Sequence, residues 1–271
     1  MSINPYIVMD SDRVDKLMVA FIQDKAPTMA IHAKERSKVQ RLYDACSTIF
    51  SSEKKRSPNL KQIRWLQGIL DNIEPVDVGI DGSSDGRSGV DESSTVNRDG
   101  LILGQSLTQI TYVHIHECDD FSMGVFCFPA GAKLPLHDHP EMVVLSKLLY
   151  GSASVKSYDW FVTPSSRREK GGLAKVVAND QVLQAPCKAS VLFPRSGGNI
   201  HSFTALTPCA ILDVLAPPYA DEQGRPSTYY SETPIPSLPG YSLLEKRDLP
   251  EDLVVVGAPY LGPELIVDAD F

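Results

Sequence analysis

Two histidines separated by a single residue are the strongest chemical signal in this sequence. His137 and His139 lie in the segment Leu136–Pro140, and alternate side chains of an extended backbone point to the same side, so both imidazoles can reach one ion. A third imidazole is available at His201, after the turn-forming run Pro194–Gly198. Three neutral nitrogen ligands leave coordination positions open, which is typical of a catalytic metal site. For the His-x-His pair alone, unrelated surface histidines are an equally good interpretation.

The spacing around these histidines favours the metal site. The pattern Gly-x5-His-x-His, followed by Gly151 and later by a Pro/Gly-rich turn and a histidine, resembles the two-part signature of the cupin family. That resemblance implies a jelly-roll β-barrel whose interior holds one divalent metal. Two positions depart from the pattern, because Val144 stands where a glutamate ligand is usual and Ala205 where an asparagine is usual. We therefore expect three histidine ligands and no carboxylate.

The missing carboxylate has a chemical consequence. Two histidines and one carboxylate are typical of non-haem iron oxygenases. Without the carboxylate, a ferrous ion keeps its full double charge and favours an anionic incoming ligand, and a thiol that coordinates a metal loses its proton. Cupins with three histidines that oxidise thiols have this arrangement, so the pattern favours thiol chemistry.

Short strands are expected to position the site. After Gly100, segments rich in β-branched and aromatic residues recur between turns, without the strand–helix alternation of a parallel α/β sheet. With the cupin resemblance, this predicts a mainly β protein, a jelly-roll barrel with N-terminal helices packed on its outside. The predicted strands cover residues 110–116, 121–128, 142–149, 153–160, 189–193, 201–206 and 210–215. From Pro217 onward we expect irregular coil that wraps the barrel, with one or two extra strands.

Helical periodicity precedes the strands. Apolar residues recur at steps of three and four over 39–50 and 60–73, which predicts two amphipathic helices, the second starting at Ser57-Pro58. A weaker helix is expected over 11–22. Residues 81–100 are almost only Gly, Ser, Asp and other polar residues, which predicts a flexible linker. The predicted division is an extension over 1–36, a helical segment over 37–80, the linker over 81–100 and the barrel over 101–271.

The composition excludes several classes of protein. The chain has 26 Lys and Arg against 34 Asp and Glu, a net charge of −8, which argues against binding nucleic acid through its phosphates. No apolar run approaches the roughly 20 residues of a membrane helix, and the N-terminus lacks the basic start of a signal peptide. Five scattered cysteines without a Cys-x-x-Cys pair favour a reducing compartment, so we expect the cytoplasm or the nucleus.

Seven blocks of the sequence resemble the plant cysteine oxidase family, whose members are relatives of the animal cysteamine dioxygenase. The resemblance runs over residues 37–266, fails over 81–100 and keeps the blocks in order. The blocks are Val39–Cys46, Ile110–Tyr112, Phe121–Pro129, Leu136–Pro140, Ser146–Ser152, Val155–Trp160 and Asp213–Tyr219.

This resemblance implies an Fe(II) enzyme that uses O2 to convert the N-terminal cysteine of a protein to its sulfinic acid. It implies N-terminal Cys proteins as substrates, such as group VII ethylene-response transcription factors. Oxidation marks these for arginylation and N-degron proteolysis, so the enzyme acts as an oxygen sensor in hypoxia. We expect a monomer that binds neither nucleic acid directly nor a membrane.

The resemblance also assigns site residues. The three histidines match the family's iron ligands, and Asp213 matches a residue needed for activity. Because residues 206–208 resemble a hairpin turn, we expect Asp213 almost opposite His201 on the neighbouring strand, where its carboxylate could accept the other ring N–H of that histidine. Tyr219 matches a tyrosine at the mouth of the site that could hydrogen-bond substrate or dioxygen.

Other interpretations remain open at this point. The same three histidines would suit Zn or Ni in an isomerase or a hydrolase. The barrel could also be a non-catalytic module that binds a ligand or a regulatory partner. Asp138 and Glu141 could lie at the pocket rim and attract a substrate amino group, or they could be solvated. His114 and His116 form a second His-x-His pair, but without a glycine framework we expect them to be ordinary strand residues.

Overall fold

The computed structural model describes residues 36–51, 57–81, 109–162, 170–251 and 253–267. The described residues from Ser37 onward belong to one compact unit. The helix expected over 11–22 and nearly all of the linker expected over 81–100 lie outside the described residues, and the proposed division into domains stays a prediction. No helix of the described part is long and apolar enough to cross a membrane.

Both helices predicted around residues 39–73 are present. They are α2 (Lys38–Phe50) and α3 (Leu60–Asp71), followed by a 3-10 helix, η2 (Pro75–Val78). Ser37 caps α2, since its side chain accepts a hydrogen bond from the amide of Gln40. The expected start of α3 at Ser57-Pro58 is wrong. Asn59 is the N-cap, because its side chain accepts from two backbone amides while Gln62 reaches back to the amide of Asn59.

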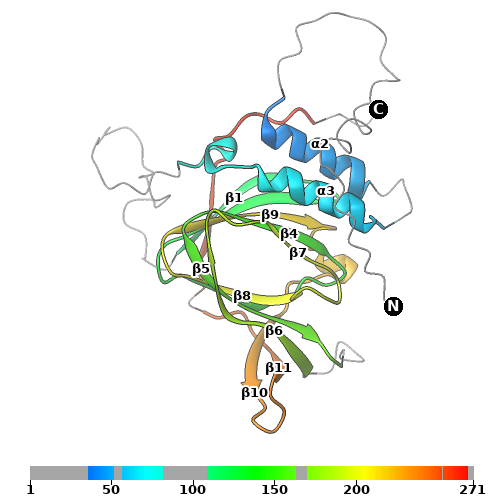
Figure 1. The fold of residues 1–271 in the computed structure, drawn as a ribbon, viewed down its shortest axis with the longest axis vertical. Coiled ribbons are helices and arrows are strands. Elements are labelled where there is room, and N and C mark those ends of the chain that lie inside the picture. Colours follow the sequence, from blue (N-terminus) through cyan, green and yellow to red (C-terminus); the bar gives the residue numbers. More distant parts are fainter. Residues whose placement is uncertain (1–35, 52–56, 82–108, 163–169, 252, 268–271) are drawn as a thin grey trace, which may run out of the picture. The chain divides into compact units, whose positions relative to one another are not determined.

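Twelve strands form two sheets in the described residues (Figure 1). The first sheet has the order β12-β1-β2-β9-β4-β7, and the second, β10-β11-β6-β5-β8-β3, closes on itself where Tyr229 pairs with His137. The strands are β1 (Ile110–Glu117), β2 (Ser122–Phe128), β3 (Lys133–His137), β4 (Val143–Tyr150), β5 (Ser152–Trp160), β6 (Gly171–Gln184), β7 (Ser190–Leu192), β8 (Ile200–Ala205), β9 (Cys209–Ala216), β10 (Tyr229–Pro234), β11 (Tyr241–Arg247) and β12 (Val255–Ala258). The mainly β barrel of cupin type with helices on its outside is therefore confirmed.

The seven predicted strands correspond to β1, β2, β4, β5, β7, β8 and β9. The short strand β3 and the long strand β6 were not predicted. Most residues of β6 are exposed or only half-buried, so the strand lacks the apolar alternation that sequence patterns detect. The expectation for the tail is also wrong, because it contains three strands, β10, β11 and β12, rather than one or two.

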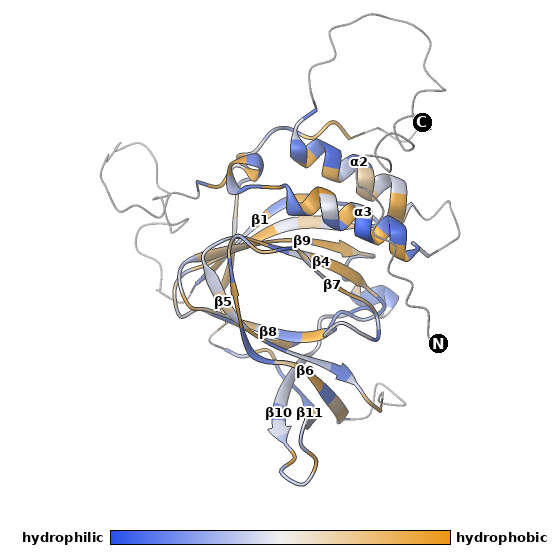
Figure 2. Ribbon diagram, viewed as in Figure 1, coloured by the Kyte–Doolittle hydropathy of each residue, from blue (hydrophilic) through white to orange (hydrophobic). Residues whose placement is uncertain are grey.

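The helices cover the outer face of the first sheet (Figure 1), and its strands β2, β4 and β9 are buried on both sides. Leu42 and Leu66 of the helices share one core cluster with Leu212 and Val214 of β9. The alternate residues of β9 point the other way, and Ile211, Asp213 and Leu215 line an internal cavity. This double burial explains why β4 and β9 are apolar over most of their length (Figure 2). Asp213 is the polar exception in β9.

Candidate metal centre

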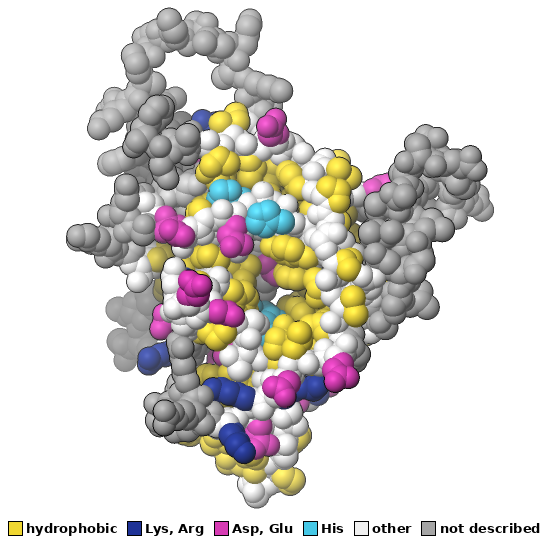
Figure 3. Space-filling view, turned by 180° about the vertical axis from the view of Figure 1, so that it is seen from behind, with side chains coloured by type: hydrophobic (Ala, Val, Ile, Leu, Met, Phe, Trp, Pro, Cys, Tyr) yellow, Lys and Arg dark blue, Asp and Glu magenta, His cyan; other side chains and the backbone are white. Residues whose placement is uncertain are grey.

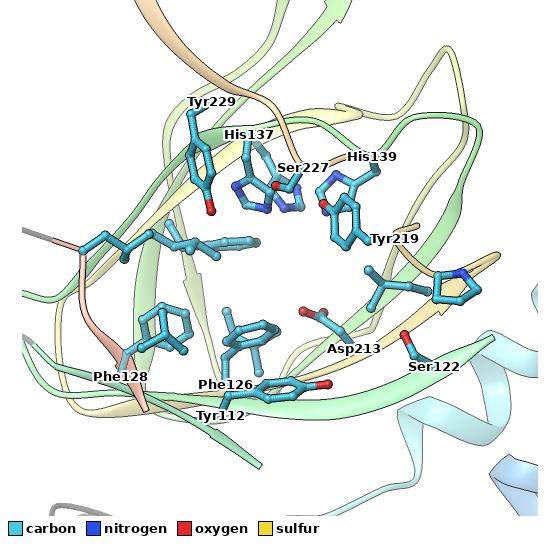
Figure 4. A pocket seen from close by; sticks show the side chains of 18 of the residues that line it. Tyr112, Ser122, Phe126, Phe128, His137, His139, Asp213, Tyr219, Ser227 and Tyr229 are labelled. Atoms are coloured by element: carbon cyan, nitrogen blue, oxygen red, sulfur yellow. The ribbon is translucent and has the colours of Figure 1, made fainter. Parts of the chain in front are cut away.

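The three predicted histidines converge at one point of the barrel interior (Figure 4). His137 ends β3 and is the direct cross-strand partner of His201 on β8, while His139 follows in the loop after β3. Their potential ligand atoms all lie within 4.8 Å of one another, and the ring centroids are 4.6–4.9 Å apart. All three side chains are buried. The three imidazoles therefore form a group that can hold one metal ion.

Hydrogen bonds prepare two of these rings as ligands. The Nδ1 atoms of His137 and His139 lie 2.8 Å from the carbonyl oxygens of Pro135 and Asn199. A carbonyl can only accept, so each Nδ1 carries the proton and each Nε2 keeps a free lone pair. Burial lowers the pKa of His137 to about 4, that of His139 to about 3, and that of His201 well below its ordinary value. All three rings are thus neutral at pH 7, the state that a metal requires.

Asn199 is a supporting residue that the sequence patterns did not identify. Its side chain accepts a hydrogen bond from the amide of His139 at 3.1 Å and donates to the carbonyl of His139 at 2.8 Å. Its backbone carbonyl accepts a hydrogen bond from Nδ1 of the same histidine, and its backbone amide donates to Oδ1 of Asp159 at 3.0 Å. Asn199 therefore fixes both the backbone and the ring of His139. The two residues are 60 positions apart in the chain, so no local pattern could reveal the pair.

Carboxylates do not join the histidine group in the described residues. Val144, at the position where a glutamate ligand was missing from the pattern, is 2% exposed and packs with Met142 and Leu192. Glu141 is exposed in a turn, with a φ of 62°. The expected group of three histidines without a carboxylate matches this arrangement.

A cavity of about 310 Å³ extends from the histidines across the barrel (Figure 4). Aromatic and aliphatic side chains form much of its wall: Tyr112, Phe126, Phe128, Phe203, Ile211 and Leu215. Figure 3 shows a hollow on the surface, bordered by hydrophobic side chains, with a histidine inside. The metal group therefore lies in a mainly apolar chamber that is open to a ligand.

Asp213 lines the same cavity, but the predicted position beside His201 is wrong. The turn at residues 206–208 does not join two paired strands, because β8 pairs with β3 and β5 while β9 pairs with β2 and β4. The carboxyl group of Asp213 therefore enters the cavity from the sheet opposite the histidines (Figure 4). Its Oδ1 is buried and has no hydrogen-bond partner among the described residues. Burial raises the pKa of Asp213 to about 7, against the opposing effect of a side-chain hydrogen bond with Ser146.

Tyr219 lies on the cavity wall, beside the histidines. Its ring centroid is 5.8 Å from that of His139, and its hydroxyl donates to the carbonyl of Asp138 at 2.7 Å. Burial is the main cause of the raised pKa of Tyr219. Since the hydroxyl proton is engaged with the backbone, the oxygen offers acceptor lone pairs to a ligand in this arrangement.

Asp138 does not lie at the pocket rim. Its carboxylate accepts hydrogen bonds from the amide of Thr228 at 2.9 Å and from the hydroxyl of Tyr230 at 2.8 Å. Burial raises its pKa, and these bonds oppose that effect. Asp138 thus ties the histidine loop to the segment that leads into β10.

His116, from the second His-x-His pair, packs edge-on against Tyr43 with ring centroids 4.8 Å apart.

The family model PCO_ADO matches residues 69–265 of this chain. The chain belongs to this family. It is 42% identical over 244 residues to Plant cysteine oxidase 1 of Arabidopsis thaliana, with 84% of this chain and 80% of the relative covered. Plant cysteine oxidase 2 of the same plant is 39% identical, with 84% and 83% covered. The human 2-aminoethanethiol dioxygenase is 30% identical, with 60% of this chain and 71% of that protein covered.

Membership of the PCO_ADO family confirms the enzyme class predicted from the sequence, a cysteine dioxygenase-type oxidoreductase. Among solved structures, an RmlC-like cupin protein from Desulfovibrio desulfuricans is similar at 22% identity and a TM-score of 0.29, covering 44% of this chain and 93% of that one. The relatives carry names of thiol-oxidising enzymes, and the three histidines lie within the matched residues.

Proposed function

We propose that this protein is an Fe(II)-dependent thiol dioxygenase that uses O2 to oxidise an N-terminal cysteine of a protein to cysteine sulfinic acid. The observation that carries this proposal is the cluster of three neutral histidines without a carboxylate, in a chain of the PCO_ADO family. The net reaction adds both atoms of O2 to the sulfur, which supplies the electrons. Ordinary reductants do not convert the sulfinic acid back to the thiol.

The donor set of the cavity fits iron. His137, His139 and His201 would hold Fe(II) through three imidazole nitrogens, and imidazole is a ligand that suits iron. Fe(II) bound there would supply a site for a thiolate and the redox chemistry that activates dioxygen. The apolar side chains of the cavity wall would offer few hydrogen bonds to water near the reacting sulfur, and the protonated Nδ1 atoms keep the rings in the tautomer that binds metal.

Asp213 and Tyr219 are proposed to orient the substrate. The unpartnered Oδ1 of Asp213 faces the cavity from the opposite sheet, where it can accept a hydrogen bond from the substrate's α-amino group or take up the thiol proton. The raised pKa of Asp213 places such a proton transfer near neutral pH. Tyr219, adjacent to His139, can accept from the amino group or, if its hydroxyl turns away from Asp138, donate to an oxygen atom.

The biological role follows from the chemistry of the product. Oxidation of the leading cysteine would depend on the supply of O2, so the enzyme would act as an oxygen sensor that passes its substrates to the Arg/N-degron pathway in hypoxia. Group VII ethylene-response transcription factors are the proposed substrates, by resemblance to the plant cysteine oxidases. This role is consistent with a monomer in the cytoplasm or nucleus.

Mass spectrometry tests the reaction directly. The protein is purified without oxygen, loaded with Fe(II) and incubated with O2 and a Cys-initiated peptide. We expect a product heavier by two oxygen atoms, and both atoms should carry the label when the gas is 18O2. The His137→Ala variant is the matched control and should give no product. Zn or Ni in the purified protein, together with an unmodified peptide in the iron-loaded assay, would instead favour the isomerase or hydrolase interpretation.

A further inference from the structure

A second cavity, of about 330 Å³, adjoins the reaction cavity. The two cavities share three wall residues, Glu117, Pro218 and Tyr219. We call the second cavity the exit groove. One of its walls is the turn after β1, from Glu117 to Asp119, and the other is the loop after β9, from Pro218 to Arg225. The exit groove therefore lies directly beside the reaction cavity.

The wall formed by the loop after β9 is held in place by its own hydrogen bonds. Arg225 donates from Nε to the carbonyl of Pro218 at 3.1 Å and from Nη2 to Oε1 of Gln223 at 2.9 Å. The backbones of Ala220 and Arg225 exchange two hydrogen bonds around the 3-10 helix η3 (Asp221–Gln223). The hydroxyl of Tyr219 is bonded to Asp138. The groove is thus preformed, which lowers the entropy cost of binding.

The opposite wall carries negative charge that the described protein does not neutralise. Glu117 and Asp119 are exposed, and neither carboxylate makes a hydrogen bond or an ion pair with another described residue. Arg225, across the groove, keeps its positive charge, because its acceptors on Pro218 and Gln223 are neutral. Two carboxylates against one guanidinium leave the lining with a net negative charge. Figure 3 shows Asp and Glu side chains gathered along one side of the hollow. The exit groove therefore favours a cationic occupant.

We propose that the exit groove receives the polypeptide that follows the substrate's N-terminal cysteine, and that Glu117 and Asp119 select substrates with Lys or Arg soon after that cysteine. The inference rests on the proposed function. A reaction cavity of about 310 Å³ has room for the end of a chain but not for a folded protein, so the rest of the substrate must leave the barrel. The adjoining groove gives it a preformed path whose charge complements a basic segment.

The size and the type of the effect follow from the exposure of these charges. An exposed ion pair changes affinity by about two- to fivefold, and added salt weakens it. The contact is made by the residues that follow the cysteine and not by the reacting sulfur, so it is the same before and during the reaction. It should therefore change KM while leaving kcat nearly constant.

The test is a panel of Cys-initiated decapeptides, identical except for one Lys, Glu or Gln at a single position after the cysteine, with a Cys-Gly dipeptide as the reference. Wild-type protein should have a KM about two- to fivefold lower for the best-placed Lys peptide than for its Glu counterpart, and high salt should reduce this ratio. The double variant Glu117→Lys/Asp119→Lys should reverse the order of the two peptides. Glu245→Lys makes the same type of charge reversal on β11, at a residue that lines neither cavity, and should keep the wild-type order.

Equal KM values for the Lys and Glu peptides at every position, or an unchanged order in the double variant, would overturn the proposed selection. Either outcome counts only if the protein measurably oxidises the dipeptide and the Gln decapeptide. That oxidation tests the proposed dioxygenase activity separately from the proposed selection. Oxidation of the dipeptide but not of any decapeptide would show that the chain does not leave through the groove. If the wild-type protein oxidises neither, the proposed function fails, and the two failures are thus distinguishable.

Discussion

The aromatic ring of Tyr112 on β1 lies against the backbone of Gly124 on β2. A Cβ atom at Gly124 would come within 2.6 Å of Cζ of that ring, closer than carbon atoms can approach. Gly124 is also the cross-strand partner of Asp213 on β9. The pKa of Tyr112 is raised to about 12, first by burial and then by the nearby charge of Asp213. The missing side chain of Gly124 thus makes room for Tyr112 beside the carboxylate that faces the metal group.

Adding one methyl group at Gly124 should therefore displace Tyr112. We expect Gly124→Ala to lower the free energy of unfolding by about 1–3 kcal/mol, because the ring must leave its position in a packed wall. Oxidation of a Cys-initiated peptide should fall as well. Urea denaturation measures the stability. The control is Gly68→Ala, in the middle of α3 with no atom within 4 Å of the new Cβ, which should raise stability by roughly 0.5–1 kcal/mol. Equal effects of the two substitutions would contradict the close contact.

Local patterns predicted the elements whose signal is contained in a few consecutive residues. The helices show apolar residues at helical steps, and strands such as β9 are short apolar runs between turns. The pair of His137 and His139, at the end of β3 and just after it, was evident for the same reason, and the third histidine came from the two-part cupin spacing.

Features that depend on pairing between distant segments were predicted wrongly or not at all. The turn at residues 206–208 looks like a hairpin, but its two strands enter different sheets, so Asp213 faces the histidines across the cavity instead of beside His201. Two further contacts exist only after the sheets have formed: the hydrogen bonds of Asn199 with His139 and the packing of Tyr112 against Gly124. Register between strands is decided by packing of whole faces, which no single segment encodes.

Removing the side chain of Asn199 should weaken metal binding without touching a ligand atom. Asn199→Ala deletes the amide that holds the backbone of His139 and should lower Fe(II) affinity by about 10- to 100-fold, as other substitutions of residues that orient metal ligands do. Competition with a chromogenic chelator measures this affinity. Asn72→Ala removes a side-chain amide whose one hydrogen bond among the described residues goes to the carbonyl of Gly68 in the helical segment, and it should leave affinity unchanged. A wild-type affinity in Asn199→Ala would show that the ring bonds alone position His139.

Restoring the carboxylate that the cupin pattern lacks should separate metal binding from thiol oxidation. Val144→Glu places an acidic side chain at the start of β4, next to the wall that contains Tyr219. If its carboxylate reaches the ion, Fe(II) content should be retained while oxidation of a Cys-initiated peptide falls at least about tenfold, because the metal no longer carries the charge that favours a thiolate. Val144→Gln has the same shape without the charge and controls for the loss of a buried valine. Equal activity in the two variants would mean that the absent carboxylate does not determine the chemistry.

The titration of Asp213 should be visible in the stability of the metal-free protein. With a folded pKa of about 7 against an ordinary value of 3.8, Asp213 holds a proton in the folded chain between these pH values and loses it in the unfolded chain. The folded state binds more protons there, so this group lowers the free energy of unfolding as pH rises, by at most about 1.4 kcal/mol per pH unit. Asp213→Asn cannot titrate at this position, so its free energy of unfolding does not fall with pH for this reason. The buried histidines raise the free energy of unfolding as pH rises, but they do so equally in both proteins. The stability of the variant relative to wild type should therefore increase from about pH 4 to pH 7 in chelator-treated urea denaturation. A difference that stays constant over this range would show that Asp213 titrates near its ordinary pKa in the folded protein.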